Sequence, residues 1–248
     1  MGNYALPCKF IQTDNLRDVP ADHTLVQAVR DELRAAADPS RAPQMQAYMK
    51  SAMPYLGVAV PRVRVIVRAV AKSRPPDTTG DLADTALTLW REAEYREERY
   101  AATALTGVSA ARRLQTTALL PVYREMITSG AWWDHVDEVS HRVGALLVAF
   151  PDEVAPVVAG WAHDDDRWLR RSSVICQVGL KGTTDTRLLT GAMIANLDDR
   201  DFFLRKAIGW ALREYAKTDP DWVRAFVAEH GDRLSPLSRR EALKHLGT

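Results

Sequence analysis

Apolar residues recur three and four positions apart along most of the chain, which is the spacing of one helix face. Val26, Val29 and Leu33 show this pattern. The period-two alternation typical of strands is nearly absent, and the exception is the valine-rich run at residues 63–67. This run follows Pro61, and proline favours the first turn of a helix, so we expect a helix here as well. The pattern predicts an all-α protein.

Turn signals divide this pattern into about a dozen helices of roughly 10–18 residues. They are proline- or glycine-containing pairs and triplets at residues 37–39, 74–76, 129–130, 150–151, 181–182, 219–220, 230–231 and 235–236. Residues 1–20 show no clear period, so we expect a loose N-terminal arm there. We expect residues 21–248 to form a single domain of helical repeats.

A basic pair recurs in the C-terminal half as Arg170-Arg171, Arg205-Lys206 and Arg239-Arg240, at offsets of 35 and 34 residues. Another expected helix precedes each pair, at residues 151–162, 185–197 and 219–230. Helix pairs at this period are typical of HEAT-like or armadillo-type solenoids, whose stacked repeats leave one curved face for binding. We therefore expect a crescent with a basic concave face.

Asp137 lies 34 residues before Arg171, so an acid occupies the register that is basic in the later units. Two interpretations remain open: a carboxylate with a chemical role, or a surface acid paired with an arginine of its own helix. Trp133 precedes Asp137 by four residues and shares its helix face. Trp132 points about 100° away from that face, towards packing.

Trp210 shares a helix face with Lys206 and Arg213, four residues before it and three after it. A tryptophan flanked by two cations can lie beside a phosphate and against a positively charged ring. A single tryptophan is more often part of a core, and this alternative applies to Trp133 and Trp210 alike.

The chain has 33 Lys and Arg and 32 Asp and Glu, so its net charge of +1 gives no argument for nucleic-acid binding. The charges are nevertheless segregated. One expected helix carries Arg62, Arg64, Arg68 and Lys72, whereas residues 77–98 contain seven acids and two arginines. Such segregation is expected of a protein with one basic groove.

Several classes of site find no support in the sequence. Cys8 and Cys176 lack metal-ligand spacing, and two distant cysteines fit a reducing cytoplasm. No apolar run reaches about 18 residues, and charged residues interrupt any signal-peptide pattern. The acids at 164–166 are explained as the N-cap of a helix that begins near Arg167. Phosphate-loop and hydrolase motifs are absent, so we expect neither a metal nor a cofactor.

Several segments together resemble the DNA alkylation repair glycosylases that are built from HEAT-like repeats. In chain order they are residues 46–50, 54–57, 129–137 (SGAWWDHVD), 167–171 (RWLRR), 207–215 (AIGWALREY) and 235–246. The resemblance runs from about residue 41 to 246. It implies a crescent whose positive concave face holds duplex DNA.

The resemblance also implies roles for particular residues. Trp133, Asp137 and Trp210 match the catalytic residues, Arg171 matches a contact to the DNA backbone, and Tyr48 matches a residue near the lesion. We expect Lys206, Arg213 and Arg240 to join Tyr48 and Arg171 in the DNA-binding face. Relatives often carry a lysine where this chain has Gly179, which puts one DNA contact and the lesion preference in doubt.

The implied activity is excision of cationic N3- and N7-alkylpurines from duplex DNA, without a base-flipping pocket and with tolerance of bulky adducts. We expect a monomer that acts in the cytoplasm, on nucleoid DNA. Two alternatives remain: a non-catalytic binder of distorted DNA, and a HEAT-like protein-interaction scaffold. The scaffold would need an apolar or acidic concave face, whereas the repeated basic pairs favour a basic one.

Overall fold

A computed structural model describes residues 21–246, and every regular element in that range is a helix. The all-α prediction is confirmed. The expected N-terminal arm at residues 1–20 lies outside the described residues. Within 21–246, no helix is long and apolar enough to cross a membrane.

The first half of the described chain contains seven α-helices and two short 3-10 helices. They are α1 (His23–Ala35), α2 (Ala42–Met49), α3 (Val60–Ser73), α4 (Thr79–Arg91), α5 (Arg96–Thr106), η1 (Ser109–Leu114), η2 (Thr117–Leu119), α6 (Leu120–Gly130) and α7 (Trp133–Ala149). The second half continues with α8 (Pro151–Trp161), α9 (Arg167–Ile175), η3 (Lys181–Thr183), α10 (Thr186–Ile194), α11 (Phe202–Tyr215), α12 (Pro220–His230) and α13 (Pro236–Ala242).

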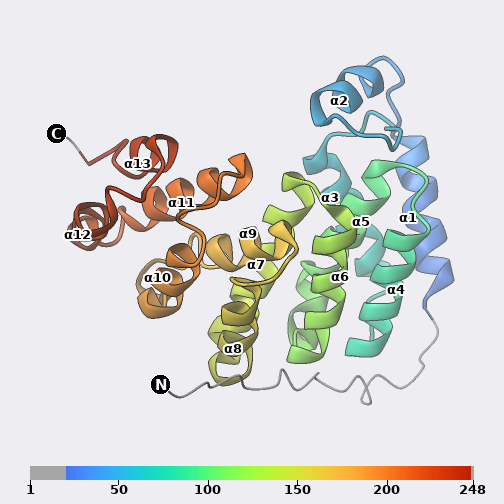
Figure 1. Cartoon of the computed structure of the whole chain (residues 1–248). Coiled ribbons are helices and arrows are strands. Elements are labelled where there is room, and N and C mark those ends of the chain that lie inside the picture. Colours follow the sequence, from blue (N-terminus) through green and yellow to red (C-terminus); the bar gives the residue numbers. More distant parts are fainter. Residues whose placement is uncertain (1–20, 247–248) are drawn as a thin grey trace.

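The helices follow one another in series, from α1 on the right of Figure 1 to α12 and α13 on the left, with α2 standing above the row. One row packs in the order α3, α5, α7, α9, α11, α13. The intervening helices α4, α6, α8, α10 and α12 each pack against a member of that row. This serial pairing is the arrangement of a helical-repeat solenoid.

The repeat is also visible in the residues that begin the helices. Asp166, Asp201 and Ser235 cap α9, α11 and α13 at offsets of 35 and 34 residues. Asp185 and Asp219 cap α10 and α12, which are 34 residues apart. Each side chain accepts a hydrogen bond from a backbone N–H of the first turn, which typically stabilises a helix by about 1 kcal/mol. The N-cap explanation for residues 164–166 is therefore confirmed.

Equivalent positions of successive repeats touch. Polar contacts join side chains to groups 34 or 35 residues away: Arg91 to Glu125, Tyr100 to Asp134, Asp137 to Arg171, Arg167 to Asp201, Asp198 to Arg233, Lys206 to Glu241 and Asn196 to the carbonyl of Ala162. The period predicted from the basic pairs is thus the period of the structure.

The valine-rich run at residues 63–67 is helical, as its position after Pro61 predicts. Val63 and Val67 are buried on one side of α3, whereas Val65 is exposed on the other. Trp132 packs against Trp168 and Phe203, with ring centroids 6.2 and 5.4 Å away. It therefore belongs to the packing between repeats, as its offset from Trp133 predicts.

Candidate active site

Helix α7 presents Trp133 and Asp137 to one cavity of about 290 Å³, enclosed by α2, α3, α5 and α7. Its lining residues are Met49, Val60, Arg64, Tyr100, Thr103, Ala104, Trp133, Asp134, His135, Asp137, Glu138 and His141. The prediction that Trp133 and Asp137 share a face is confirmed. Trp132, the N-cap of α7, makes no side-chain capping bond, so other contacts must fix the first turn that carries Trp133.

Arg171 holds Asp137 from the next repeat. Its Nε donates to Oδ1 at 2.8 Å and its Nη2 donates to Oδ2 at 2.9 Å, while Nη1 donates to the carbonyl of Phe203 at 2.6 Å. The Arg171 side chain is only 6% exposed, and that of Asp137 is 18% exposed. The alternative of a pair within one helix is wrong, because the partner lies on α9.

The hydrogen-bond acceptor sites of Asp137 that Arg171 leaves free decide what this carboxylate can do chemically. A carboxylate has about four acceptor sites, and the two bonds from Arg171 occupy two of them. The exposed fraction leaves the others open towards the cavity. Burial raises the pKa of Asp137 above its ordinary value, even though the Arg171 guanidinium opposes that shift. Asp137 is thus a fixed carboxylate with free lone pairs and a weakened preference for the charged form.

A second carboxylate in the cavity, Asp134, is more fully engaged. Arg96 donates to both of its oxygens, at 3.1 and 2.6 Å, and the Tyr100 hydroxyl donates to Oδ2 at 2.6 Å. Burial would raise the pKa of Asp134, but His135, Arg96 and Tyr100 together hold it below its ordinary value. Asp134 therefore stays ionised and anchors the first turn of α7 to α5.

The N-terminal end of α5, which carries Arg96, also fixes the segment between α2 and α3 by hydrogen bonds. The buried Glu97 carboxylate accepts three backbone N–H groups at 2.9 to 3.0 Å, from Leu56, Gly57 and Val58. Arg96 donates to Ser51 at 3.3 Å. Neighbouring residues of α5 thus fix both α7 and the chain that follows α2.

Close packing requires glycine in that segment. Gly57 has a φ of +87°, and a Cβ there would lie 2.0 Å from the carbonyl oxygen of Asp38. The roles of Arg96, Tyr100 and Asp134 were not predicted from the sequence. One signal was available, because Tyr100 precedes Asp134 by 34 residues, the period of the repeat.

His135 lies at the buried side of the cavity, 1% exposed, and neither of its ring nitrogens has a hydrogen-bond partner. Its ring packs against Trp90 and Tyr100, with centroids 4.9 and 5.1 Å away. Burial lowers the pKa of His135 to about 3, and Arg96 and Arg99 act in the same direction against Asp134. His135 is therefore neutral at physiological pH.

The other expected site residues do not line this cavity. Trp210 is half-buried against the C-terminal core cluster. Lys206 and Arg213 both form an ion pair with Glu241 of α13, which confirms their shared face but neutralises part of their charge. Arg171 provides the link to α11, because it bonds to Phe203 two helical turns before Trp210.

Tyr48 and Arg240 lie at the surface. Tyr48 is 76% exposed on α2, and the adjacent Met49 lines the cavity. Arg240 is exposed on α13 and makes no ion pair within residues 21–246. Their expected contacts to DNA stay predictions.

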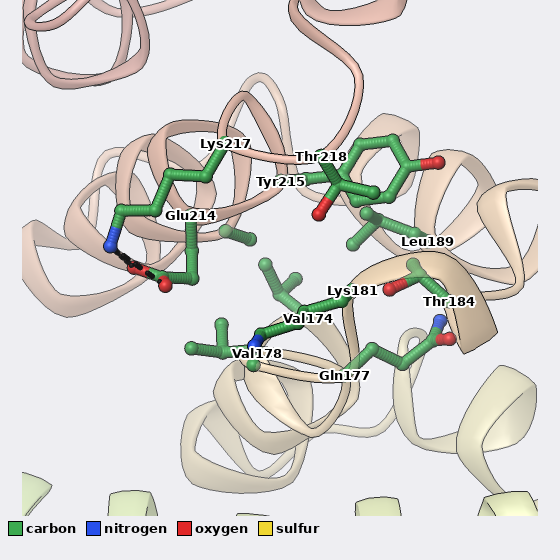
Figure 2. A pocket seen from close by; sticks show the side chains of 12 residues that line it. Val174, Gln177, Val178, Lys181, Thr184, Leu189, Glu214, Tyr215, Lys217 and Thr218 are labelled. Carbon is green, nitrogen blue, oxygen red and sulfur yellow. Dashed lines mark hydrogen bonds and ion pairs between the residues drawn. The ribbon is translucent and has the colours of Figure 1, made fainter.

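A larger cavity of about 370 Å³ lies between α9, α10 and α11 (Figure 2). Its wall combines apolar residues such as Val174 and Leu189 with Lys217, whose ammonium pairs with Glu214 at 2.7 Å. Gly179 lines this cavity with a φ of +90°. None of the expected catalytic or DNA-binding residues lies there. Among residues 21–246 no group of three or more His, Cys, Asp or Glu could hold a metal ion.

Comparison with known proteins places this geometry in a family. The family model of the DNA alkylation repair enzymes matches residues 29–246. The chain belongs to this family. A solved structure described as a predicted DNA alkylation repair enzyme from Enterococcus faecalis is 28% identical, with a TM-score of 0.77 over 86% of this chain and 97% of that one.

A second solved structure is the Pseudomonas fluorescens alkylpurine DNA glycosylase AlkC bound to DNA containing an abasic-site analogue. It is 15% identical, with a TM-score of 0.44 over 92% of this chain and 65% of that one. The search of curated proteins found no match.

Proposed function

We propose that this DNA alkylation repair enzyme is a monofunctional DNA glycosylase that hydrolyses the N-glycosidic bond of N3- and N7-alkylated purines in duplex DNA. The observation that carries the proposal is the placement of Asp137. Its carboxylate is fixed by Arg171, keeps free acceptor sites and lies beside Trp133 at the cavity. Family membership supports the same reaction class.

The chemistry requires stabilisation of positive charge. An N3- or N7-alkylated purine is already cationic and leaves readily, so positive charge develops on the deoxyribose as the bond breaks. A carboxylate near the anomeric carbon stabilises that charge and orients the attacking water. Indole faces add cation–π attraction of about 0.5–2 kcal/mol each. Asp137 has the first role, and Trp133 and Trp210 have the second.

The lining of the cavity argues against a protonated acid acting on the leaving group. Its three carboxylates, Asp134, Asp137 and Glu138, each pair with an arginine. A cationic base leaves without being protonated, so it needs no such acid. Without an acid, an uncharged base is a poor leaving group, and the substrates are therefore restricted to cationic adducts. We propose that the base is cleaved without insertion into a base-flipping pocket. A lesion that is not inserted need not fit a pocket, so we propose that bulky adducts are also tolerated.

Tyr48, Arg171, Lys206, Arg213 and Arg240 are the proposed DNA-binding residues. Arg171 keeps free N–H groups after its bonds to Asp137 and Phe203, because a guanidinium carries five. Lys206 is 41% exposed beside Glu241. Two cations share that one carboxylate, so the cluster around Trp210 keeps a net positive charge.

The deciding experiment is incubation of the protein with duplex DNA methylated at purines, followed by identification of the released bases. We expect 3-methyladenine and 7-methylguanine in the supernatant and abasic sites in the DNA. The matched control is Asp137→Asn protein with unchanged thermal melting. Absence of any released base from DNA that the wild-type protein binds would refute the glycosylase and leave a non-catalytic binder.

A further inference from the structure

Helix α3 carries an exposed row of cations that the proposed active-site roles do not use. Arg64, Arg68 and Lys72 stand at intervals of four residues, so they follow one side of the helix over about 12 Å. All three are exposed, and α3 contains no acidic residue. We call Arg64, Arg68 and Lys72 the α3 row.

The α3 row begins at the candidate active site. Arg64 lines the cavity of Trp133 and Asp137, where its Nη2 donates to Glu138 of α7 at 2.7 Å and its side chain remains 49% exposed. Arg68 and Lys72 continue from this point away from the cavity. Within residues 21–246, neither forms an ion pair or a side-chain hydrogen bond. Their full charge is therefore available to a partner.

Arg68 and Lys72 differ from the cations near Trp210 in having no acidic partner within residues 21–246. Arg171 is buried against Asp137, and Lys206 and Arg213 share Glu241, so each has an internal counter-charge. The acid that pairs with the row lies on another element: Glu138 of α7 contacts Arg64. With a net charge of only +1 over the chain, the unpaired Arg68 and Lys72, which continue the row from the site, favour binding of a polyanion along α3.

We propose that the α3 row binds successive phosphates of one DNA strand on the side of the lesion that faces α2 and α3. The inference rests on the proposed function, because it takes the cavity as the position of the lesion. One strand of a duplex carries a phosphate per about 3.4 Å of helix axis, so 12 Å of α3 faces three to four phosphates. Arg64 then contacts the phosphate nearest the reacting sugar, and Lys72 the one farthest from it.

The test measures binding of a fluorescent 25-base-pair duplex by anisotropy at several salt concentrations. Each phosphate contact contributes about 0.9 to the slope of log K against log salt. We expect Arg68→Ala and Lys72→Ala each to reduce the slope by about that amount, and the double variant by about twice as much. The matched control is Arg187→Ala, which removes one exposed positive charge from α10.

Three results would overturn the inference. They are an unchanged slope in the double variant, a loss in Arg187→Ala equal to that of the α3 variants, and tighter binding by the charge-reversed Arg68→Glu. Single-turnover release of 7-methylguanine at saturating protein separates this outcome from the proposed function. We expect the Arg68 and Lys72 variants to need a higher protein concentration than the wild type to reach saturation, whereas Arg187→Ala should need the wild-type concentration. Failure of the wild-type protein to release any base would refute the glycosylase while leaving the binding slopes interpretable.

Discussion

Asp137 and Arg171 lie 34 residues apart in the sequence, yet the guanidinium of Arg171 contacts both carboxylate oxygens of Asp137, at 2.8 and 2.9 Å. The contact crosses from α7 to α9, so the solenoid repeat itself places the two residues side by side. It fixes the carboxylate in one orientation. A carboxylate held in this way loses no freedom when charge develops in front of it, which is the condition for efficient electrostatic stabilisation.

Replacing Asp137 with asparagine should abolish most excision and preserve the fold. Asparagine keeps one oxygen for Arg171, but it removes the negative charge that stabilises the sugar cation. Loss of one such group typically costs about 10²–10³ in rate, or roughly 3–4 kcal/mol. The measurement is single-turnover release of 7-methylguanine, with thermal melting and DNA binding as controls. Near-normal excision by a folded variant would assign the reaction to another group.

The raised pKa of Asp137 predicts a pH dependence of excision. The reaction needs the carboxylate in its charged form, so the rate should fall on acidification through the folded-state pKa. Since burial moves that pKa upward, the acid limb should lie above the ordinary aspartate value of 3.8. Arg171→Lys, which loses the two-point contact, should move the limb further up. A limb at or below 3.8 in the wild-type protein would contradict this.

The sequence predicts much of this site because its residues lie on one helix. Spacing alone places Trp133 and Asp137 on one face and turns Trp132 away. The contacts that fix them join distant segments, and no local pattern contains those. Glu241 pairs with Lys206 and Arg213. In the sequence, only its position one repeat, or 35 residues, after Lys206 indicates this contact. The ties of Arg96 to Ser51 and Asp134 need the packed structure, since these residues lie 45 and 38 positions apart.

His135 should make the protein sensitive to acid. Its folded-state pKa is about 3, against 6.5 when unfolded. Below pH 6.5 the unfolded chain therefore binds a proton that the folded protein excludes. Stability is fully present above that pH and is lost as the pH falls towards 3, by about 1.4 kcal/mol per pH unit.

Replacing His135 with phenylalanine tests this dependence. The variant keeps an aromatic ring against Trp90 and Tyr100 and removes two unpaired buried nitrogens. We expect its free energy of unfolding in urea to change less between pH 7 and pH 5 than that of the wild-type protein. An equal change in both proteins would show that other groups cause the acid sensitivity.

Tyr100 should affect the reaction without touching the substrate, by fixing Asp134 and hence the first turn of α7. Its hydroxyl donates to Asp134 at 2.6 Å and lies 2.8 Å from the hydroxyl of Tyr55. Burial and the neighbouring Asp134 raise its pKa, so the proton stays on the tyrosine. Tyr100→Phe removes one bond to a charged group, which costs about 1.5–3 kcal/mol of stability.

We expect Tyr100→Phe to slow single-turnover excision about tenfold, equivalent to about 1.4 kcal/mol in the barrier, with unchanged affinity for duplex DNA. In this variant Arg96 alone holds Asp134, so the first turn of α7 is less firmly fixed. The rate falls because this turn carries Trp133 and has no side-chain capping bond of its own. Tyr123→Phe is the matched control, since it loses a buried hydroxyl bonded to Gln115 at 2.6 Å outside the cavity. Both variants should melt at lower temperature, but only Tyr100→Phe should react more slowly. Equal rates in the two variants would mean that the network around Asp134 serves stability alone.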